Sequence, residues 1–449
     1  MNAADSPRSP LIVFSAGDLS GDMHAAHLAI RLREEWARRH PNAPPLRIAA
    51  AGASHLRAAG AEIWEDTTDW GTIGIFEGIK KLPTLLMAKR RLVKRIGRER
   101  PDLVVPVDYR GFNMSLLKTI RTRPDGSRQP AVYYIAPVLW WNPGESKTRA
   151  AINAMVEAMK NLPGKARKNA RDRFDALAEL VDLALVAYPF SLDSYQRAGV
   201  NFKYIGHPLG RIAAELAAKR LYLDRFGEAL EGKRLVGIAP GSRIHELAFH
   251  IPVLRELVER LLKRYPDLWF YCPVPSPKLE PHIRDGFGLM AKMIQFVPDD
   301  CYDLMAASDL LIVKSGTSVQ LALLLAVPAV TFYKIGNAWM VKLGKRMFQD
   351  LPYYTFPNLL AGREVVPEFV QERFTLPNLY VACTELLDDP AKAGHMRAEL
   401  AELRKLTMEP DPLGTASAAI CDLLDRVNPY VPSASRPRKM EVARPARRR

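Results

Sequence analysis

The sequence predicts an α/β protein made of two Rossmann-like, doubly wound domains that face a cleft. Two observations support this fold class. Short apolar runs that are typical of buried strands alternate with helical patterns, and the alternation starts again after Pro208. Strands that alternate with helices favour a parallel sheet covered on both faces, and such sheets bind ligands at the carboxyl ends of their strands.

The expected strands form two series along the chain. The first series is 11–15, 46–51, 103–107, 131–135, 183–187 and 202–205. The second series is 234–239, 268–272, 294–297, 310–313 and 329–332. We therefore expect an N-terminal domain at 1–208 with a helical insertion at 151–180, a C-terminal domain at 209–428 with closing helices, and a basic, disordered tail at 429–449.

The composition is that of a globular protein of the cytoplasm. With 449 residues, 48% of them hydrophobic and 25% charged, the chain can build the cores of two domains. Its cysteines are scattered without a C-x-x-C pair, which fits reduced thiols better than a disulfide framework or a zinc site. The sequence contains neither an N-terminal signal pattern nor an apolar run of about 18 residues, so we expect a protein that does not cross a membrane.

Positive charge is concentrated in the tail and in residues 80–100, and a third basic cluster spans residues 147–173. The net charge is +15, and residues 430–449 contain seven Lys or Arg against one Glu, while residues 80–100 contain nine against one acid. Within residues 80–100, segment 82–98 combines apolar and basic residues at helical spacing. Such a helix can lie on an anionic membrane, or it can pack its apolar stripe on the sheet, and both can hold if the basic face meets lipid. Nucleic-acid binding would rest on charge alone, and we do not predict it.

Two loops of the first domain could carry chemistry. The first strand leads into Gly17, Asp18, Ser20, Gly21 and Asp22. Their small size lets backbone amides at a helix N-terminus face a ligand, although a plain strand-to-helix turn capped by a serine or aspartate explains them equally well. Asp108 follows the strand at 103–107, where its carboxylate could take a proton from an attacking hydroxyl or could instead cap the next helix.

Two loops of the second domain suit a phosphate. The first contains Gly241, Ser242 and Arg243. The second contains Ser315, Gly316, Thr317 and Ser318. Glycine permits close approach of the backbone, arginine can bond a phosphate with two nitrogens, and a helix N-terminus attracts a diphosphate. The chain contains no D-x-D or H-E-x-x-H pattern, so we predict no metal and expect protein groups to stabilise the diphosphate.

Six sequence blocks carry a resemblance to a known family. They are AGDLSGD (16–22), IGIFEGIKKLPTLL (73–86), VDYRGFN (107–113), IGHPL (205–209), APGSRIHE (239–246) and FPNLLAGREVVPEFVQE (356–372). With them the chain resembles the lipid-A-disaccharide synthase family from about residue 11 to about residue 424. The resemblance implies a GT-B fold, with an acceptor domain followed by a nucleotide-sugar domain.

The resemblance also implies an activity. Members of the family are inverting hexosyltransferases of lipid A biosynthesis that move a 2,3-diacylglucosamine unit from UDP to 2,3-diacylglucosamine 1-phosphate. A UDP-diacylglucosamine-like donor and a lipid phosphosugar acceptor are therefore the expected substrates, with no cofactor. The resemblance further implies a peripheral position on the inner face of the cytoplasmic membrane, and a homodimer is plausible from exchanged C-terminal segments.

Individual roles follow from the matched positions. Asp108 would be the general base and Arg243 a phosphate ligand. The other matched candidates are Gly17, Asp18, Ser20, Gly21, Asp22, Glu77 and Asn113 on the acceptor side, and Gly241, Ser242, Ser315, Gly316, Thr317, Ser318, Gln320, Asn358 and Glu364 near the nucleotide sugar. Asp18 replaces a glutamate of the family pattern, and Gln320 stands near a family glutamate that the chain lacks.

Three alternatives to this activity remain at the level of sequence. The first is a related GT-B enzyme with a different UDP-sugar or lipid acceptor. The second is a UDP-sugar 2-epimerase, which shares the double fold and would form an epimer without an acceptor. The third is a catalytically degenerate nucleotide-sugar binding protein, because carboxylates of the family pattern are missing.

Overall fold

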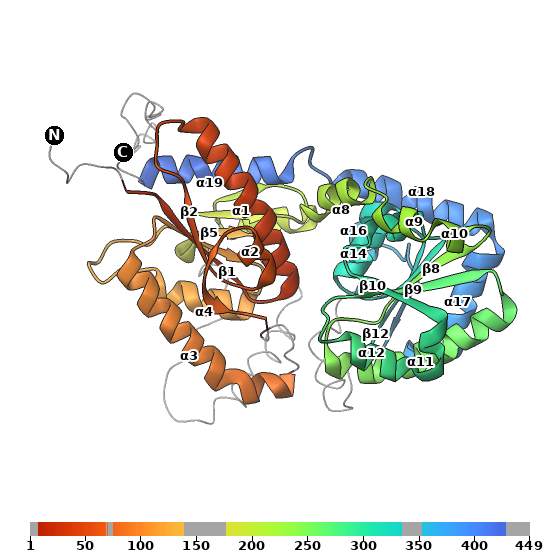
Figure 1. The fold of residues 1–449 in the computed structure, drawn as a ribbon. Coiled ribbons are helices and arrows are strands. Elements are labelled where there is room, and N and C mark those ends of the chain that lie inside the picture. The colour runs from red at the N-terminus through yellow and green to blue at the C-terminus, as the bar shows by residue number, and fades with distance from the viewer. Residues whose placement is uncertain (1–7, 69, 71–74, 139–176, 335–352, 428–449) are drawn as a thin grey trace, which may run out of the picture.

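The computed structural model describes residues 8–68, 70, 75–138, 177–334 and 353–427, and of residues 75–82 only the backbone. In these ranges the chain forms two parallel sheets with helices on both faces (Figure 1). The sheets lie side by side, and loops from the carboxyl ends of their strands approach each other across the boundary. The predicted α/β fold of two doubly wound domains is confirmed.

The first sheet has seven strands in the order β3-β2-β1-β4-β5-β6-β7. The strand order reverses between β1 and β4, which pair in parallel with Ile12 opposite Leu103. The strands are β1 (Leu11–Ala16), β2 (Arg47–Gly52), β3 (Glu62–Asp66), β4 (Leu103–Val107), β5 (Val132–Tyr134), β6 (Leu183–Val186) and β7 (Phe202–Tyr204). The helices are α1 (Leu19–Arg39), α2 (Ser54–Ala58), α3 (Ile75–Glu99), α4 (Arg110–Ile120), η1 (Pro189–Ser191) and α7 (Leu192–Arg197).

The second sheet has six strands in the order β10-β9-β8-β11-β12-β13. Its order reverses between β8 and β11, where Leu310 lies opposite Val236. The strands are β8 (Arg234–Ala239), β9 (Leu268–Val274), β10 (Ile294–Pro298), β11 (Leu310–Lys314), β12 (Ala329–Tyr333) and β13 (Glu368–Val370). The helical segments are α8 (Leu209–Ala217), α9 (Leu221–Arg225), α10 (Gly227–Leu230), α11 (Ile244–Arg264), α12 (Glu280–Phe287), η2 (Gly288–Met293), α13 (Tyr302–Ala307), α14 (Thr317–Leu325), α16 (Phe356–Ala361), η3 (Gln371–Arg373), α17 (Leu376–Asp388), α18 (Pro390–Thr407) and α19 (Pro412–Val427).

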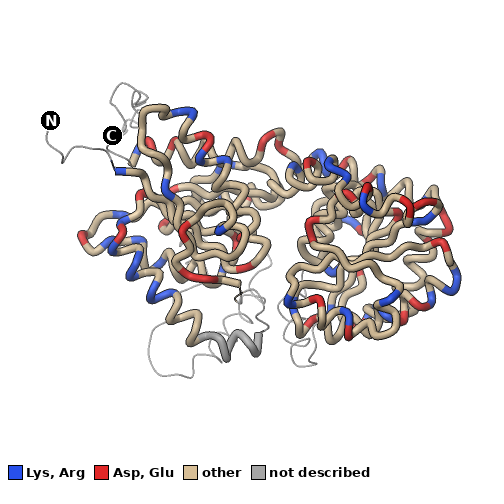
Figure 2. The backbone as a smooth tube through the Cα atoms, viewed as in Figure 1, with Lys and Arg blue, Asp and Glu red and all other residues tan. Residues whose placement is uncertain are grey.

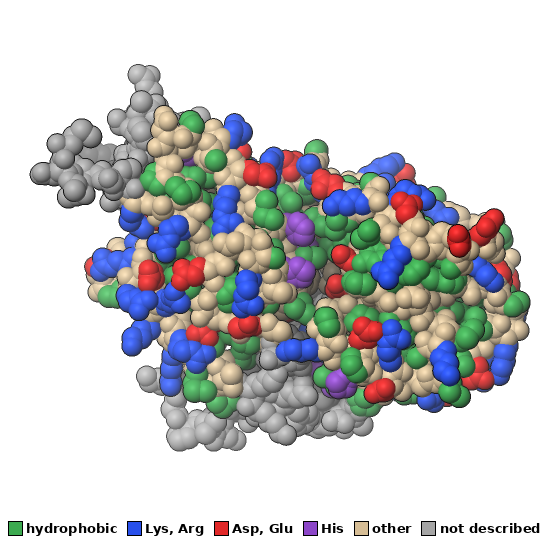
Figure 3. All heavy atoms as spheres, in the orientation of Figure 1, with side chains coloured by type: hydrophobic (Ala, Val, Ile, Leu, Met, Phe, Trp, Pro, Cys, Tyr) green, Lys and Arg blue, Asp and Glu red, His purple; other side chains and the backbone are tan. Residues whose placement is uncertain are grey.

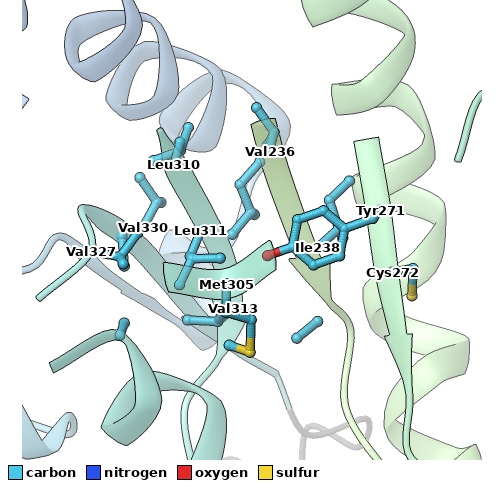
Figure 4. Packing of buried hydrophobic residues seen from close by; sticks show 14 of the residues in the cluster. Val236, Ile238, Tyr271, Cys272, Met305, Leu310, Leu311, Val313, Val327 and Val330 are labelled. Carbon is cyan, nitrogen blue, oxygen red and sulfur yellow. The ribbon is translucent and has the colours of Figure 1, made fainter. Parts of the chain in front are cut away.

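The central strands of the second sheet are buried on both faces, which explains their nearly continuous apolar sequences. Val236 and Leu310 are fully buried and lie in the same core cluster as Tyr271 (Figure 4). The Tyr271 hydroxyl shares a hydrogen bond of 2.8 Å with Ser308 Oγ, so this polar group is not left unpaired in the core. Gly237 makes room for the ring, because a Cβ there would lie 2.6 Å from the Tyr271 hydroxyl oxygen.

The apolar runs of the sequence do not reveal β3 and β13, which lie at sheet edges. β3 has the sequence EIWED, in which two apolar residues stand between charged ones and only Trp64 is buried. β13 has three residues and begins with the charged Glu368, so only Phe369 and Val370 are apolar and no apolar run marks it. An edge strand pairs on one side only, so its sequence need not be apolar throughout.

The chain passes twice between the domains. Residues 205–208 lead from β7 into α8, and residues 408–411 lead from α18 into α19. The two connections cross in contact, because a Cβ on Gly206 would lie 2.8 Å from the Glu409 backbone nitrogen. Gly206 also has φ 68, a left-handed conformation that favours glycine.

Helix α19 returns to the first domain. Its buried residues Ile420 and Leu424 belong to the core cluster that contains Leu28 of α1. Arg39 of α1 donates a hydrogen bond of 2.7 Å to Asp422 of α19. The segment 209–428, expected as one C-terminal domain, therefore ends with a helix that packs on the N-terminal domain. An apolar stripe predicts that a helix is covered, but not which sheet covers it.

Helix α3 carries Lys and Arg along its described length (Figure 2). Its apolar stripe is buried on the first domain through Ala88, Leu92 and Ile96. Arg91 forms an ion pair of 2.6 Å with Glu65, and the Arg95 guanidinium lies 4.6 Å from the centre of the Trp64 ring. The structure thus confirms one of the two expectations for segment 82–98, namely that its apolar stripe packs on the sheet. No helix in the described ranges is long and apolar enough to span a bilayer.

Candidate active site

The loops singled out in the sequence follow the four strands at the two reversals of strand order. In the first sheet, residues 17–22 follow β1 and Asp108 follows β4. In the second sheet, residues 241–243 follow β8 and residues 315–318 follow β11. A reversal of strand order opens a crevice at the carboxyl ends of the strands, and doubly wound proteins bind ligands there. The two crevices face each other across the domain boundary.

Asp108 and Tyr109 form a strained turn between β4 and α4. Their φ angles are 41° and 38°, a left-handed conformation that is unfavourable for residues other than glycine. Two donors hold the Asp108 carbonyl oxygen, since the Tyr133 hydroxyl donates to it at 2.6 Å and Asn113 Nδ2 at 3.0 Å. These bonds stabilise the turn that carries the Asp108 side chain.

Asn113 is fully buried and ties the ends of β1 and β4 together. Its Nδ2 also donates to the carbonyl oxygens of Ser15 and Val107, each at 3.1 Å, and its Oδ1 accepts from Ser15 Oγ at 2.7 Å. All polar atoms of this side chain are thus used inside the protein. The residue expected at the acceptor positions the loop that carries Asp108 and does not reach the cleft.

Asp108 is an exposed residue, but protein atoms surround its carboxyl group closely enough to perturb its acidity. Partial desolvation by the protein around it raises its pKa to about 6, and the nearby negative charge of Asp18 contributes to the rise. A carboxyl group with such a pKa is ionised near neutral pH and binds a proton more readily than an ordinary aspartate. This is the property that a general base needs.

Asp18 links the first loop to the second domain. Its carboxylate caps α1 by accepting a hydrogen bond of 2.7 Å from the Gly21 amide. Desolvation raises its pKa, and the positive charge of Arg243 in the opposite domain acts against that rise. Gly17 lies under the ring of Tyr109, because a Cβ there would be 1.9 Å from the ring. Ser20 is half-buried in the first turn of α1.

The loop after β8 forms a group of charges around one carboxylate. Gly241 has φ 122, which only glycine adopts readily, and the exposed Ser242 follows it. Glu246 is 2% exposed and forms an ion pair of 3.3 Å with Arg243 and another of 3.3 Å with Lys314. The sequence identified Arg243 but gave no role to Glu246 or Lys314, although the lysine interrupts an otherwise apolar run.

The loop after β11 begins α14 at the cleft. Gly316 precedes the helix with φ 151, and Thr317 and Ser318 form its first turn, where backbone amides have no partner within the helix. Ser315 Oγ donates to the Tyr354 carbonyl oxygen at 3.4 Å. This geometry fits an anion at the start of α14.

Gln320 is bound to the other domain. Its Nε2 donates a hydrogen bond of 3.0 Å to the hydroxyl of Tyr188, which follows β6 of the first sheet. The Tyr188 ring also packs on Phe356 and His207, with ring centres 5.3 Å and 5.4 Å apart. Histidine side chains gather where the two halves meet (Figure 3). Gln320, expected near the nucleotide sugar, therefore also connects the two domains, and the sequence does not predict the role of Tyr188.

Two further expected site residues, besides Asn113, are structural. Asp22 is fully buried, and its oxygens accept hydrogen bonds from the amides of Ala53 at 2.6 Å and His55 at 2.8 Å. Asn358 is also fully buried, and its amide bonds to the backbone of residues 365 and 366 and to Glu368. Neither side chain reaches the cleft, because both hold backbone segments behind it.

The remaining expected site residues lie elsewhere or are not described. Glu364 is exposed and lies before the amino end of β13, beside a hollow of about 420 Å³ lined by α17 and α18 residues such as Ala382 and Met396. That hollow contains none of the four loops. Glu77 belongs to α3, but its side chain lies outside the described residues. In the part of the chain that the structure describes, no cluster of three His, Cys, Asp or Glu could hold a metal, and independence from metal stays a prediction.

Comparison with known proteins assigns the family. The sequence profile of the lipid-A-disaccharide synthetase family matches residues 12–164 and 168–411. The chain belongs to this family. A lipid-A-disaccharide synthase of Geobacter sulfurreducens is 31% identical over 398 residues, which cover 88% of this chain and 92% of that protein. The family makes the chain a glycosyltransferase of lipid A biosynthesis, as expected from the six blocks. Residues 151–180, which the sequence suggested as an insertion, also match the family profile, apart from residues 165–167.

Solved structures with the same fold include both enzyme classes considered above. A UDP-GlcNAc 2-epimerase from Neisseria meningitidis superimposes with a TM-score of 0.56 at 13% identity, covering 93% of this chain and all of that one. The glycosyltransferase of kitacinnamycin superimposes with a TM-score of 0.56 at 18% identity, with 93% of this chain and all of that one covered. These likenesses establish the GT-B fold only. Because the chain belongs to the synthetase family, the glycosyltransferase activity is favoured over the epimerase activity.

Proposed function

We propose that the enzyme transfers a diacylglucosamine unit from UDP to the hydroxyl group of a diacylglucosamine 1-phosphate, with inversion, and that Asp108 is the general base. One observation carries the proposal. Asp108, whose pKa is raised to about 6, stands in a strained turn at the domain boundary, where its charge acts on Tyr188, the acceptor of a hydrogen bond from Gln320 of α14 in the opposite domain. A candidate proton acceptor and two loops suited to a diphosphate therefore lie on the two sides of one domain boundary, which supports the proposal.

In this mechanism the first domain activates the acceptor and the second domain stabilises the leaving group. The acceptor oxygen attacks the anomeric carbon and loses its proton to Asp108, while the bond from that carbon to the UDP oxygen breaks. The leaving diphosphate gains a negative charge, which Arg243 and the amides of Thr317 and Ser318 would stabilise. Attack from the first domain and departure into the second place nucleophile and leaving group on opposite sides, as inversion requires.

A transfer assay tests the assignment. Wild-type enzyme with UDP-2,3-diacylglucosamine and 2,3-diacylglucosamine 1-phosphate should give the disaccharide, and Asp108→Asn should lower the rate by roughly 10²- to 10⁴-fold. Asp193→Asn, which changes an exposed aspartate on α7, is the matched control and should keep full activity. An epimer formed from the donor without acceptor, or equal rates for Asp108→Asn and wild type, would overturn the proposal.

We further propose that α3 brings the enzyme to the inner face of the cytoplasmic membrane. Leu86 and Met87 are exposed large apolar residues on this helix, and Arg90 and Lys94 are exposed beside them. Apolar side chains next to basic ones suit the headgroup region of an anionic bilayer.

Vesicle sedimentation tests the membrane surface. The double variant Arg90→Glu, Lys94→Glu should bind phosphatidylglycerol vesicles less than wild type. The control is Lys203→Glu with Lys219→Glu, which changes the net charge equally at exposed sites in β7 and after α8 and should bind vesicles like wild type. Equal loss in both double variants would assign the binding to net charge and not to α3. The expected homodimer is tested by measuring the molar mass in solution.

A further inference from the structure

The ion pair between Lys314 and Glu246 lies between the two glycine turns of the second domain. Lys314 ends β11 and is 16% exposed, and its Nζ is 3.3 Å from Glu246 Oε2. Its Cγ is 3.7 Å from where a Cβ on Gly241 would lie, and its Nζ is 3.7 Å from the same point on Gly316. The lysine side chain therefore spans the space between the Gly241 and Gly316 turns.

Glu246 serves two cations at once. Its Oε1 pairs with Arg243 at 3.3 Å and its Oε2 with Lys314 at 3.3 Å. Within the second domain, one carboxylate against two cations leaves one positive charge next to the positive end of α14, and the Asp18 carboxylate of the first domain faces it through Arg243. Tyr333 lies on the other side, with its ring centre 5.2 Å from Lys314 Nζ. The group is held in place before any ligand arrives.

An internal ion pair contributes little to the stability of the folded state. Removing two charges from water costs several kcal/mol, and apolar residues of similar size often stabilise as well or better. Burial lowers the pKa of Lys314, and Glu246 opposes this effect. Glu246 keeps the lysine charged, and further positive charge lies beside it. This arrangement is better explained by anion binding than by a contribution to core stability.

We propose that Lys314 is a second phosphate-binding cation of the donor site, and that Glu246 is a positioning residue that holds Lys314 and Arg243 for the diphosphate. This inference rests on the proposed function. When the glycosidic bond breaks, its electron pair moves to the diphosphate oxygen, and the two cations stabilise the added charge. They supply positive charge at the leaving oxygen, which a bound metal ion can also do.

Binding of UDP and of uridine, which lacks the phosphates, tests the proposal. Lys314→Met should weaken UDP binding in calorimetric titration by roughly 10- to 100-fold, as expected for loss of a hydrogen bond to a charged group. Uridine binding, followed by NMR titration, should stay unchanged. Lys314→Arg should keep UDP binding within a few-fold of wild type, because it keeps the charge.

Lys233→Met is the matched control, since Lys233 is exposed just before the amino end of β8, at the opposite end of the sheet. Unchanged UDP binding by a folded Lys314→Met protein would overturn the proposal. The Lys314–Glu246 ion pair would then have only a structural role. Equal weakening of UDP and uridine would also overturn it, because the whole pocket would then have changed. Either result would leave the proposed function intact if Asp108→Asn still slows transfer. Failure of the wild type to bind UDP would instead refute the proposed function.

Discussion

Asn113 Nδ2 donates a hydrogen bond of 3.0 Å to the carbonyl oxygen of Asp108. The same nitrogen contacts the ends of β1 and β4, so a single buried amide fixes the reversal of strand order and the proposed catalytic turn together. The turn needs this support, because Asp108 and Tyr109 both have left-handed backbone angles.

Replacing Asn113 by Ala should therefore lower activity without removing any group that contacts substrate. Loss of the buried hydrogen bonds should destabilise the protein by about 2–4 kcal/mol and lower kcat more than it changes KM. Urea unfolding and steady-state kinetics measure the two effects. Asn201→Ala, which removes one exposed hydrogen bond to the Asp182 carbonyl oxygen, is the control. A normal kcat in the folded Asn113→Ala enzyme would show that the turn needs no such support.

The raised pKa of Asp108 predicts opposite effects on activity and stability. A base must be ionised to act, so kcat/KM should rise with pH through about 6 and then level off. The folded state binds the proton more tightly than the unfolded state, so ionising this group lowers stability as pH rises from about 4 to 6. Asp108→Asn should thus transfer much more slowly than wild type and yet be more stable than wild type at pH 7. A less stable variant in thermal unfolding would contradict the shift.

Gly17 and Tyr109 offer a test of the contact between the two loops of the first domain. A Cβ on Gly17 would overlap the Tyr109 ring, so Gly17→Ala should displace the ring and destabilise the protein by about 1–3 kcal/mol. Adding Tyr109→Ala should restore most of that loss, because the overlap disappears. A double-mutant cycle from urea unfolding measures the coupling. Additive effects would mean that the ring does not lie on the glycine.

The sequence was sufficient to predict the double fold and the four loops, because buried parallel strands are apolar and their ends are marked by small and polar residues. It could not show where each side chain points. Asp18 and Asp22 are four residues apart in one helix start, yet only Asp18 faces the cleft. Lys314 was passed over because its partner Glu246 is distant in sequence and meets it only across neighbouring strands.

The family block 356–372 shows the same limit and yields the last prediction. Asn358 was expected near the nucleotide, but its amide holds the Val365 and Val366 backbone and meets Glu368, which also accepts from Thr355. Asn358→Ala should therefore destabilise the protein by about 2–4 kcal/mol, because several buried partners lose their bonds. The Kd for UDP of the folded fraction should stay near that of wild type. Asn378→Ala, which removes an exposed hydrogen bond to the Arg373 carbonyl oxygen, should change neither quantity. If Asn358→Ala weakened UDP binding at unchanged stability, the amide would contact the nucleotide after all.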